Sequence, residues 1–261
     1  MSIGKVFNLS FKAILSYDGT RYFGWQKTKT GPSIQEELEK AILRITSELT
    51  QPEAASRTDR GVHAEGQTVH FYLKKEFEPQ RLQRGLNAVL PPDIRIVALE
   101  SVSPHFHPTL QAEGKEYHYR LSMGLVQDPI HRHYSWHVPH PLDLIAMEKA
   151  SQDLLGKHDF TSLANESEKN PYCTLEKIRI GSLDNGMMQI SLNGDRFLYK
   201  MARNIVGTLV YIGCGKLPLD CIPSLLASRD RKKAGITAPA QGLFLHQVFY
   251  NISKEGKIVP C

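Results

Sequence analysis

The sequence predicts an α+β fold made of two halves, in which helices pack on antiparallel strands that form a shared central sheet. Strand-like and helix-like segments alternate along the chain. Residues 103–112, which are rich in proline and histidine, separate two sets of such segments. The 261 residues suffice for one large domain or two smaller ones. We therefore expect an N-terminal half over residues 1–104 and a C-terminal half over residues 105–261, with a cleft where they meet.

The N-terminal half begins with an alternating strand. Apolar residues at every second position from Phe7 to Leu15 indicate a strand that runs into a turn at residues 17–20. Ser33 and Glu36 form a capping box, and apolar residues at helical spacing continue this helix to about residue 48. The rest of the half is predicted as a loop, a strand, a helix and a strand, over residues 50–66, 68–73, 79–89 and 94–98.

The C-terminal half repeats this mixture. The Asp-Asn-Gly turn at residues 184–186 predicts a hairpin between strands at 175–183 and 187–192. The other predicted strands cover residues 115–123 and 243–250. The predicted helices cover residues 142–155, 197–214 and 219–228.

The composition indicates a soluble protein with an anionic partner. The net charge is +5 and the pI is near 8.9. The four cysteines, Cys173, Cys214, Cys221 and Cys261, form no CxxC pair, so we expect reduced thiols in the cytoplasm and neither disulfides nor zinc. The apolar run at residues 205–214 is about half the length of a membrane span, which favours a buried helix.

A polar loop at residues 55–64 carries the candidate chemistry. It places Asp59 between Arg57 and Arg60, with His63 close behind. Neighbouring guanidiniums favour the ionised carboxylate, which is the form that a nucleophile or general base needs. A polar turn without chemistry would have the same composition. Spacing alone therefore leaves both interpretations open.

Five motifs follow one another along the chain and span nearly all of it. The polar loop contains R-T-D-R-G-V-H at residues 57–63. The other motifs are S-Y-D-G-T-R-Y-F-G-W-Q at 16–26, G-K-E-Y-H-Y-R at 114–120, F-L-Y-K-M-A-R-N-I-V-G at 197–207, and A-G-I-T-A-P-A with G-L at 234–240 and 242–243. In this order they resemble the motifs of the tRNA pseudouridine synthase A family, whose members isomerise uridines in the anticodon arm of transfer RNA.

The resemblance implies both a fold and a reaction. The fold is that of pseudouridine synthases, with two ferredoxin-like halves, a shared sheet and the active site between the halves. The implied reaction converts uridine to pseudouridine at positions 38, 39 and 40 of transfer RNA. It needs no cofactor and no metal, which agrees with a sequence that lacks nucleotide-binding glycine motifs and metal-ligand clusters. The resemblance also implies a homodimer with no membrane association.

The resemblance assigns roles to particular residues. Asp59 is the catalytic carboxylate, which either attacks ribose C1′ or removes the C2′ proton. Tyr117 packs on the uracil and Arg203 pairs with the carboxylate, since an arginine in an apolar helix needs a partner. Arg57 holds the flipped nucleotide or fills its vacated place.

Basic residues are expected to contact the RNA backbone, although each could equally be a solvated surface charge. These residues are Arg21, Lys27, Lys29, Arg60, Arg81, Arg84 and Lys115, with a further basic run at residues 229–233. Three positions depart from the family pattern. They are Ser56, where glycine is expected, Arg60, where alanine is common, and residues 107–109, where His-Pro-Thr replaces the more usual His-Ala-Arg.

Two other functions belong to different classes. A non-catalytic RNA-binding protein would keep the fold without needing Asp59, Tyr117 and Arg203. A glycosidase or nucleoside hydrolase would also act at an anomeric carbon, usually with two carboxylates, and Glu65 is a second acid close to Asp59 in the chain. Neither alternative would leave a C-glycosidic nucleoside in the RNA.

Overall fold

The structure, a computed structural model, describes residues 9–167, 169–183 and 186–251. The chain forms two compact units. Unit 1 contains the chain up to Glu113 and again from Leu245 onward, and unit 2 is Gly114–Phe244. These units differ from the predicted halves, divided after residue 104, because the last strand returns to unit 1. In the described part of the chain, no helix is both long enough and apolar enough to cross a membrane.

Unit 1 is built on antiparallel strands. Their order is β4 (Ile94–Val102), β1 (Leu9–Tyr17), β3 (His63–Leu73) and β10 (Leu243–Tyr250), and the short β2 (Glu53–Ala54) pairs with β3. Phe11 of β1 lies opposite Phe71 of β3, and their rings stack with centroids 5.6 Å apart. Both rings are buried and belong to the core of the unit.

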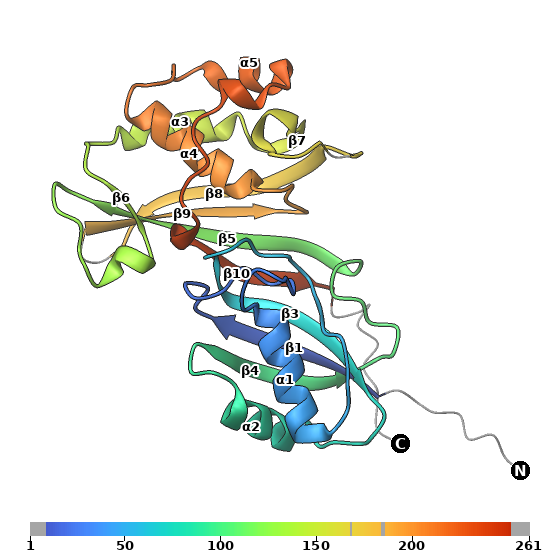
Figure 1. Ribbon diagram of the computed structural model, residues 1–261. Coiled ribbons are helices and arrows are strands. Elements are labelled where there is room, and N and C mark those ends of the chain that lie inside the picture. The colour runs from blue at the N-terminus through green and yellow to red at the C-terminus, as the bar shows by residue number, and fades with distance from the viewer. Residues whose placement is uncertain (1–8, 168, 184–185, 252–261) are drawn as a thin grey trace, which may run out of the picture. The chain divides into compact units, whose positions relative to one another are not determined.

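Two helices pack together on these strands, and Figure 1 shows α1 lying across the strands with α2 beside it. They are α1 (Ile34–Thr46) and α2 (Pro79–Val89). The Ser33 hydroxyl accepts a hydrogen bond from the Glu36 N–H at 3.3 Å, as the predicted cap requires. On α1, Ile34, Leu38, Ala41 and Ile42 are buried at helical spacing.

Helix α2 also covers the outer edge of β4. The Asn87 carboxamide accepts from the Ile96 N–H at 2.8 Å and donates to the Ile96 carbonyl at 2.9 Å. The Gln83 carboxamide donates to the carbonyls of Ile96 and Val97 at 2.9 and 3.0 Å. Side-chain amides thereby bind backbone groups that a further strand would otherwise bind.

Unit 2 contains a second set of strands. Their order is β5 (Ala112–Met123), β9 (Met187–Gly194), β8 (Tyr172–Ser182) and β7 (Gly156–Asp159), and β6 (Trp136–Val138) runs parallel to β5. Strands β8 and β9 form the predicted antiparallel pair. Two residues of the predicted turn, 184 and 185, lie outside the described residues.

Three helices complete unit 2, and α3 and α4 pack against each other (Figure 1). The helices are α3 (Leu144–Gln152), α4 (Met201–Gly213) and α5 (Cys221–Ser228). Single 3-10 turns are η1 (His131–His133), η2 (Thr161–Leu163), η4 (Arg231–Lys233) and η5 (Ala240–Gly242).

The predicted α+β class is confirmed, with strands in a large sheet and helices packed on them. The prediction of helix from residue 197 was wrong, because Lys200 has φ +60° and a left-handed residue ends helical geometry. The loop predicted at residues 50–66 was too long, since β3 already begins at His63. The first residues of β3 include polar side chains that are largely buried, so the sequence there shows no strand-like alternation of apolar and polar positions. Strands β2, β6 and β7 were missed because they are short.

Candidate active site

The Asp59 loop lies between β2 and β3 in unit 1. The Asp59 carbonyl accepts from the Val62 N–H at 3.1 Å, and Gly61 has φ +77°, which a residue with a side chain rarely adopts. Trp25 donates its N–H to the Thr58 carbonyl at 3.0 Å. Asp59 is half-buried in this tight turn. The backbone hydrogen bonds at Thr58 and Asp59 fix the position of the main chain that carries the carboxylate.

The first motif, residues 16–26, holds this loop through close backbone contacts. A Cβ atom on Gly19 would lie 2.0 Å from the Val62 carbonyl oxygen. At Gly24, which has φ +95°, it would lie 2.6 Å from the Thr58 carbonyl oxygen. At both positions the absence of a side chain therefore allows the first motif to contact the Asp59 loop closely.

His63 ends the loop and is almost fully buried. Its Nδ1 accepts from the Gly19 N–H at 3.0 Å, an arrangement in which Nδ1 carries no proton. The Asp18 carboxylate lies 3.2 Å from the same nitrogen. His63 thus links the first motif to the Asp59 loop.

Ser56 fits the loop without a glycine. Its N–H donates to the Gln67 side-chain oxygen at 3.2 Å, and its carbonyl accepts from the Gln67 amide at 2.6 Å. Ser56 is not among the residues with positive φ, so its side chain introduces no backbone strain there. The departure from glycine at this position is therefore compatible with the loop conformation. Gln67 is not recognisable as a supporting residue from the sequence, because a buried amide on a strand has no distinctive pattern.

The two loop arginines point to solvent and behave differently. Arg57 is exposed. The Arg60 guanidinium, also on an exposed residue, stacks over the Phe23 ring with 4.0 Å between its Cζ and the ring centroid. Cation–π stacking at an exposed site contributes only about 0.5–1 kcal/mol, so Arg60 can exchange this contact for another.

Tyr117 lies on β5 in unit 2. It is 6% exposed, and its ring meets the Phe197 ring edge-on with centroids 4.9 Å apart. Lys115 precedes it by two residues, and burial together with the charge of Arg196 lowers the pKa of Lys115 to about 8. An aromatic ring and a cation thus lie close together on this strand.

Arg203 lies in the first turn of α4. Its Nε donates to the Ala238 carbonyl at 2.7 Å, and the Ala238 N–H returns a bond to the Arg203 carbonyl at 3.1 Å. The closing motif and the helix motif therefore meet at this residue. Burial raises the pKa of nearby Tyr119 well above its usual value, and the positive charge of Arg203 opposes that rise.

A set of internal hydrogen bonds, here termed the Arg231 network, holds the closing motif on α4. The Arg231 guanidinium donates to Asn204 Oδ1 at 2.8 Å, Thr237 Oγ1 at 2.9 Å and the Gly235 carbonyl at 2.8 Å. Thr237 Oγ1 in turn donates to Asn204 Oδ1 at 2.7 Å. Arg231 therefore faces inward, and its guanidinium is occupied by these internal bonds and not directed toward an RNA phosphate. Of the other residues in the basic run at 229–233, Lys232 and Lys233 are exposed.

The predicted residues fall into two groups. Unit 1 holds Arg21, Lys27, Lys29, Arg57, Asp59, Arg60, Arg81 and Arg84, and unit 2 holds Lys115, Tyr117 and Arg203. Most of the basic ones are exposed, and two have acidic neighbours: Arg21 lies 3.5 Å from Asp93, and Lys27 lies 3.0 Å from Glu39. The structure brings Arg57, Asp59 and Arg60 into one loop, and pairing of Asp59 with Arg203 stays a prediction.

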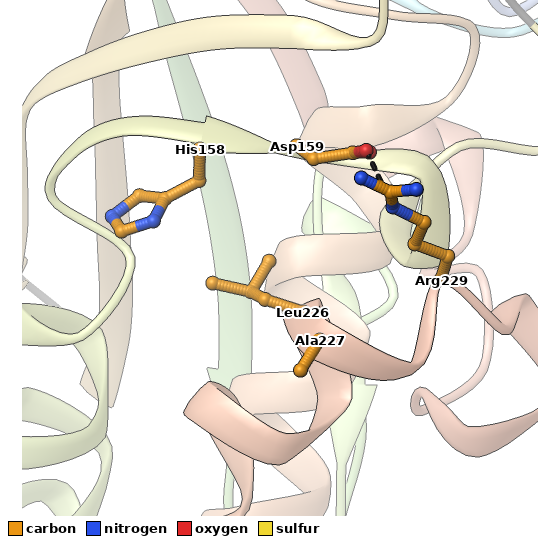
Figure 2. A pocket seen from close by; sticks show the side chains of 5 residues that line it. All are labelled: His158, Asp159, Leu226, Ala227 and Arg229. Atoms are coloured by element: carbon orange, nitrogen blue, oxygen red, sulfur yellow. Dashed lines mark ion pairs between the residues drawn. The ribbon is translucent and has the colours of Figure 1, made fainter.

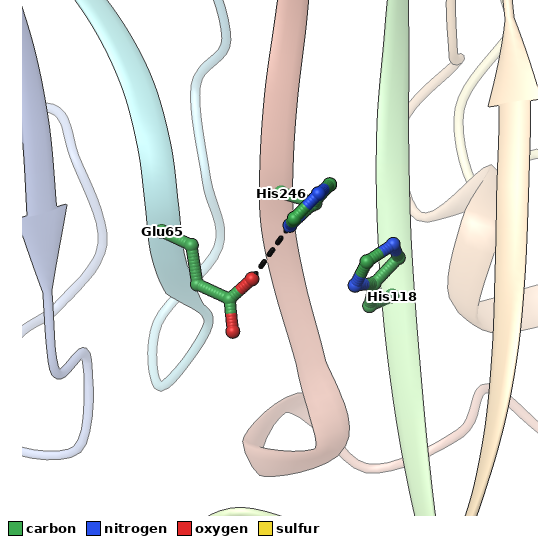
Figure 3. A group of neighbouring side chains, drawn as sticks. All are labelled: Glu65, His118 and His246. Atoms are coloured by element: carbon green, nitrogen blue, oxygen red, sulfur yellow. Dashed lines mark hydrogen bonds and ion pairs between the residues drawn. The ribbon is translucent and has the colours of Figure 1, made fainter.

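Two other polar places in the structure contain none of these residues. A cavity of about 300 Å³ in unit 2 is lined by His158, Asp159, Leu226, Ala227 and Arg229 (Figure 2). Its Arg229 Nε lies 2.8 Å from an Asp159 oxygen. In unit 1, Glu65 on β3 turns toward His246 on β10, with 2.7 Å between Oε2 and Nδ1 (Figure 3). Glu65 thus has a structural partner.

The chain matches the family model described as tRNA pseudouridine synthase over residues 13–109 and 150–251. It is 46% identical over 246 residues to tRNA pseudouridine synthase A 2 of Protochlamydia amoebophila, covering 92% of this chain and 94% of that protein. It is 39% identical over 244 residues to tRNA pseudouridine synthase A of Streptococcus equi, with 92% and 98% covered. The structure of an H/ACA RNP bound to a substrate RNA containing 2′-deoxyuridine aligns with 77% of this chain and 44% of that chain, with 9% identity and a TM-score of 0.37. Four of the five motifs lie inside the ranges of the family model, and residues 114–120 lie between them.

Proposed function

This chain belongs to the tRNA pseudouridine synthase family, a family of isomerases, and we propose that it isomerises uridine at positions 38, 39 and 40 in the anticodon arm of transfer RNA. The reaction breaks the bond from ribose C1′ to uracil N1 and forms one from C1′ to C5. The C5 proton is removed and N1 gains one, so the atoms balance without a co-reactant.

We assign Asp59 as the catalytic carboxylate. Its place in the R-T-D-R-G-V-H motif supports this, as does a turn that fixes the backbone on both sides of it. The carboxylate either attacks C1′ or removes the C2′ proton. Both routes need an ionised oxygen held in one position, and a positioned group is worth far more than a mobile one.

The other proposed site residues follow from their motifs and surroundings. Tyr117 packs on the extruded uracil. The edge-on contact between the Tyr117 and Phe197 rings places a second aromatic ring beside it, which supports this role. Arg203 provides the counter-charge for the carboxylate, with its Nε held by the Ala238 carbonyl. Arg57 is exposed in the loop beside Asp59 and holds the flipped nucleotide or fills its place.

Transfer RNA is the proposed partner. Contacts to its phosphates come from cations spread over both units. These are Arg21, Lys27, Lys29, Arg60, Arg81, Arg84 and Lys115. A homodimer, action in the cytoplasm, and a reaction without metal or cofactor remain proposals from the family resemblance and the cysteine pattern.

Pseudouridine mapping tests the proposal. Purified protein is incubated with transfer RNA that carries uridines in the anticodon arm, in parallel with Asp59→Asn and with Glu65→Gln as a matched carboxylate control. We expect conversion by the wild type and by Glu65→Gln, and none by Asp59→Asn, because the amide can neither attack carbon nor accept a proton at neutral pH.

Other outcomes identify the alternatives. If the wild type releases free uracil and leaves an abasic ribose, and if both Asp59→Asn and Glu65→Gln abolish this release, the protein is a two-carboxylate hydrolase. Tight RNA binding without any conversion by the wild type would indicate a binding protein and would overturn the transfer RNA assignment.

A further inference from the structure

Four largely buried groups in unit 1 form what we term the Gln67 network. At its centre, the Gln67 carboxamide binds the Ser56 backbone in both directions, accepting from the N–H at 3.2 Å and donating to the carbonyl at 2.6 Å. The Gln67 side chain is completely buried. A side-chain amide that satisfies both backbone groups of one residue acts as a neighbouring strand would, and it fixes both the position and the direction of that residue.

The second contact lies two residues further along the loop. The Tyr17 hydroxyl and Thr58 Oγ1 are 2.7 Å apart, and the Gln67 amide lies 3.4 Å from the Tyr17 oxygen. Tyr17 is 4% exposed and Thr58 is 7% exposed. Because the interior screens these bonds poorly, they are stronger than surface bonds, and losing one leaves a buried polar group without its partner.

We infer that Gln67 and Tyr17 are positioning residues for the Asp59 carboxylate, an inference that rests on the proposed function. The network forms hydrogen bonds with the Ser56 backbone and the Thr58 hydroxyl, whereas Arg57, which lies between them in the chain, is exposed. Asp59 immediately follows Thr58, so any shift in Thr58 moves the carboxylate. A misplacement of about 1 Å can lower a rate about a hundredfold.

The Tyr17–Thr58 contact can be removed without changing the shape of either side chain much. Tyr17→Phe deletes one hydroxyl, Thr58→Val replaces the other with a methyl group, and Thr58→Ser keeps the hydroxyl. Tyr250→Phe is the matched control. It also deletes a tyrosine hydroxyl of unit 1, one that donates to the Pro108 carbonyl at 2.6 Å, outside the Asp59 loop.

The experiment measures kcat for pseudouridine formation, the Kd for transfer RNA and the Tm of each full-length variant. We expect Tyr17→Phe and Thr58→Val to lower kcat about 10- to 100-fold while Kd stays within about twofold. Thr58→Ser should recover most of the rate. Tyr250→Phe should lower Tm about as much as Tyr17→Phe and leave kcat unchanged.

Gln67 is tested separately, since a buried replacement can prevent folding. In Gln67→Glu a carboxylate oxygen faces the Ser56 carbonyl, and this variant should lose more activity than Tyr17→Phe. If it does not fold, the hydroxyl variants carry the test alone.

The inference fails if Tyr17→Phe and Thr58→Val match Tyr250→Phe in kcat, because the network then supports only stability. It also fails if Kd rises in proportion to the loss of kcat/KM, since the network would then shape RNA binding. Failure of the proposed function looks different, because the wild type would produce no pseudouridine.

Discussion

The Asp59 loop in unit 1 and the start of α4 in unit 2 are each held by a buried hydrogen-bond network, but the networks differ in charge. The Gln67 network uses neutral groups, a carboxamide and two hydroxyls. The Arg231 network centres on a guanidinium that binds neutral oxygens of Asn204, Thr237 and Gly235. Burial lowers the pKa of Arg231.

Because the charges differ, the two networks should tolerate substitution unequally. A neutral hydrogen bond contributes about 0.5–1.5 kcal/mol, so the Gln67 network can lose one bond and keep its fold. A partly buried cation depends on all of its acceptors together, and its bonds are stronger individually. We therefore expect damage to the Gln67 network to appear mainly in catalysis and damage to the Arg231 network mainly in stability.

The largest effect is expected where α4 meets the closing motif. Gly207→Ala should lower the free energy of unfolding by more than about 3 kcal/mol, although alanine favours helices over glycine by about 1 kcal/mol. The new Cβ would lie 1.7 Å from the Ile236 carbonyl oxygen. Urea unfolding followed by circular dichroism measures this. Gly181→Ala, whose Cβ would have open space, is the control and should be nearly neutral.

The next effect tests the charge in the Arg231 network. Arg231→Leu should lose about 2–3 kcal/mol of unfolding free energy, because four acceptors lose a charge-assisted bond, the fourth being Asn165 Oδ1 at 3.4 Å from Arg231 Nε. Arg231→Lys should recover only part of it, since an ammonium cannot reproduce the planar fork of donors. Lys232→Gln on the exposed neighbour should stay within about 0.5 kcal/mol. Equal losses for Arg231→Leu and Lys232→Gln would remove the contrast between the two networks.

A third prediction concerns acid sensitivity in unit 1. Burial, with a contribution from the positive charge of His107, lowers the pKa of His70 to about 4 from 6.5. Between these pH values the unfolded chain binds a proton that the folded chain does not, so stability falls as the pH drops from 6.5 to 4. We expect a loss of about 2 kcal/mol over this window in the wild type, and a clearly smaller one in His70→Gln, by urea unfolding at several pH values.

The smallest effect concerns alkaline pH in unit 2. The pKa of Lys115 is about 8 in the folded chain and 10.5 in the reference state, so between these values the unfolded chain binds the extra proton. Stability should therefore rise with pH over this window, by about 1 kcal/mol after allowing for solvent screening. Unfolding of the wild type and Lys115→Met at pH 7.5 and 9.5 measures the difference. An identical pH response in both would show that Lys115 does not titrate in this range.

Much of the fold could be predicted because its signals are local. Ser33 caps a helix through a residue three positions away, and the strand at residues 243–250 has the predicted ends. The start of β3 could not be predicted, because its polar residues are buried by segments distant in the sequence. The break before α4 depends on a left-handed Lys200, and lysine gives no sign of that conformation.

For the candidate site, the sequence predicts the residues that lie in the family motifs but not the residues that hold them in place. The resemblance pointed to Asp59, Tyr117 and Arg203, but it could not show what supports them. Gln67 and Arg231 act through buried contacts with backbone and amide oxygens. In the sequence, such residues look like an ordinary strand glutamine and a surface arginine.

The amide contacts of α2 with β4 have a consequence for how the protein behaves at high concentration. An edge strand with unoccupied backbone groups can recruit a strand from another molecule and start aggregation. At Ile96 both groups are already bound by Asn87, and the Val97 carbonyl is bound by Gln83. Helix α2 thereby blocks sheet extension between molecules in the first half of this edge, and it does so with carboxamide side chains instead of the charged side chains or prolines that many edge strands use.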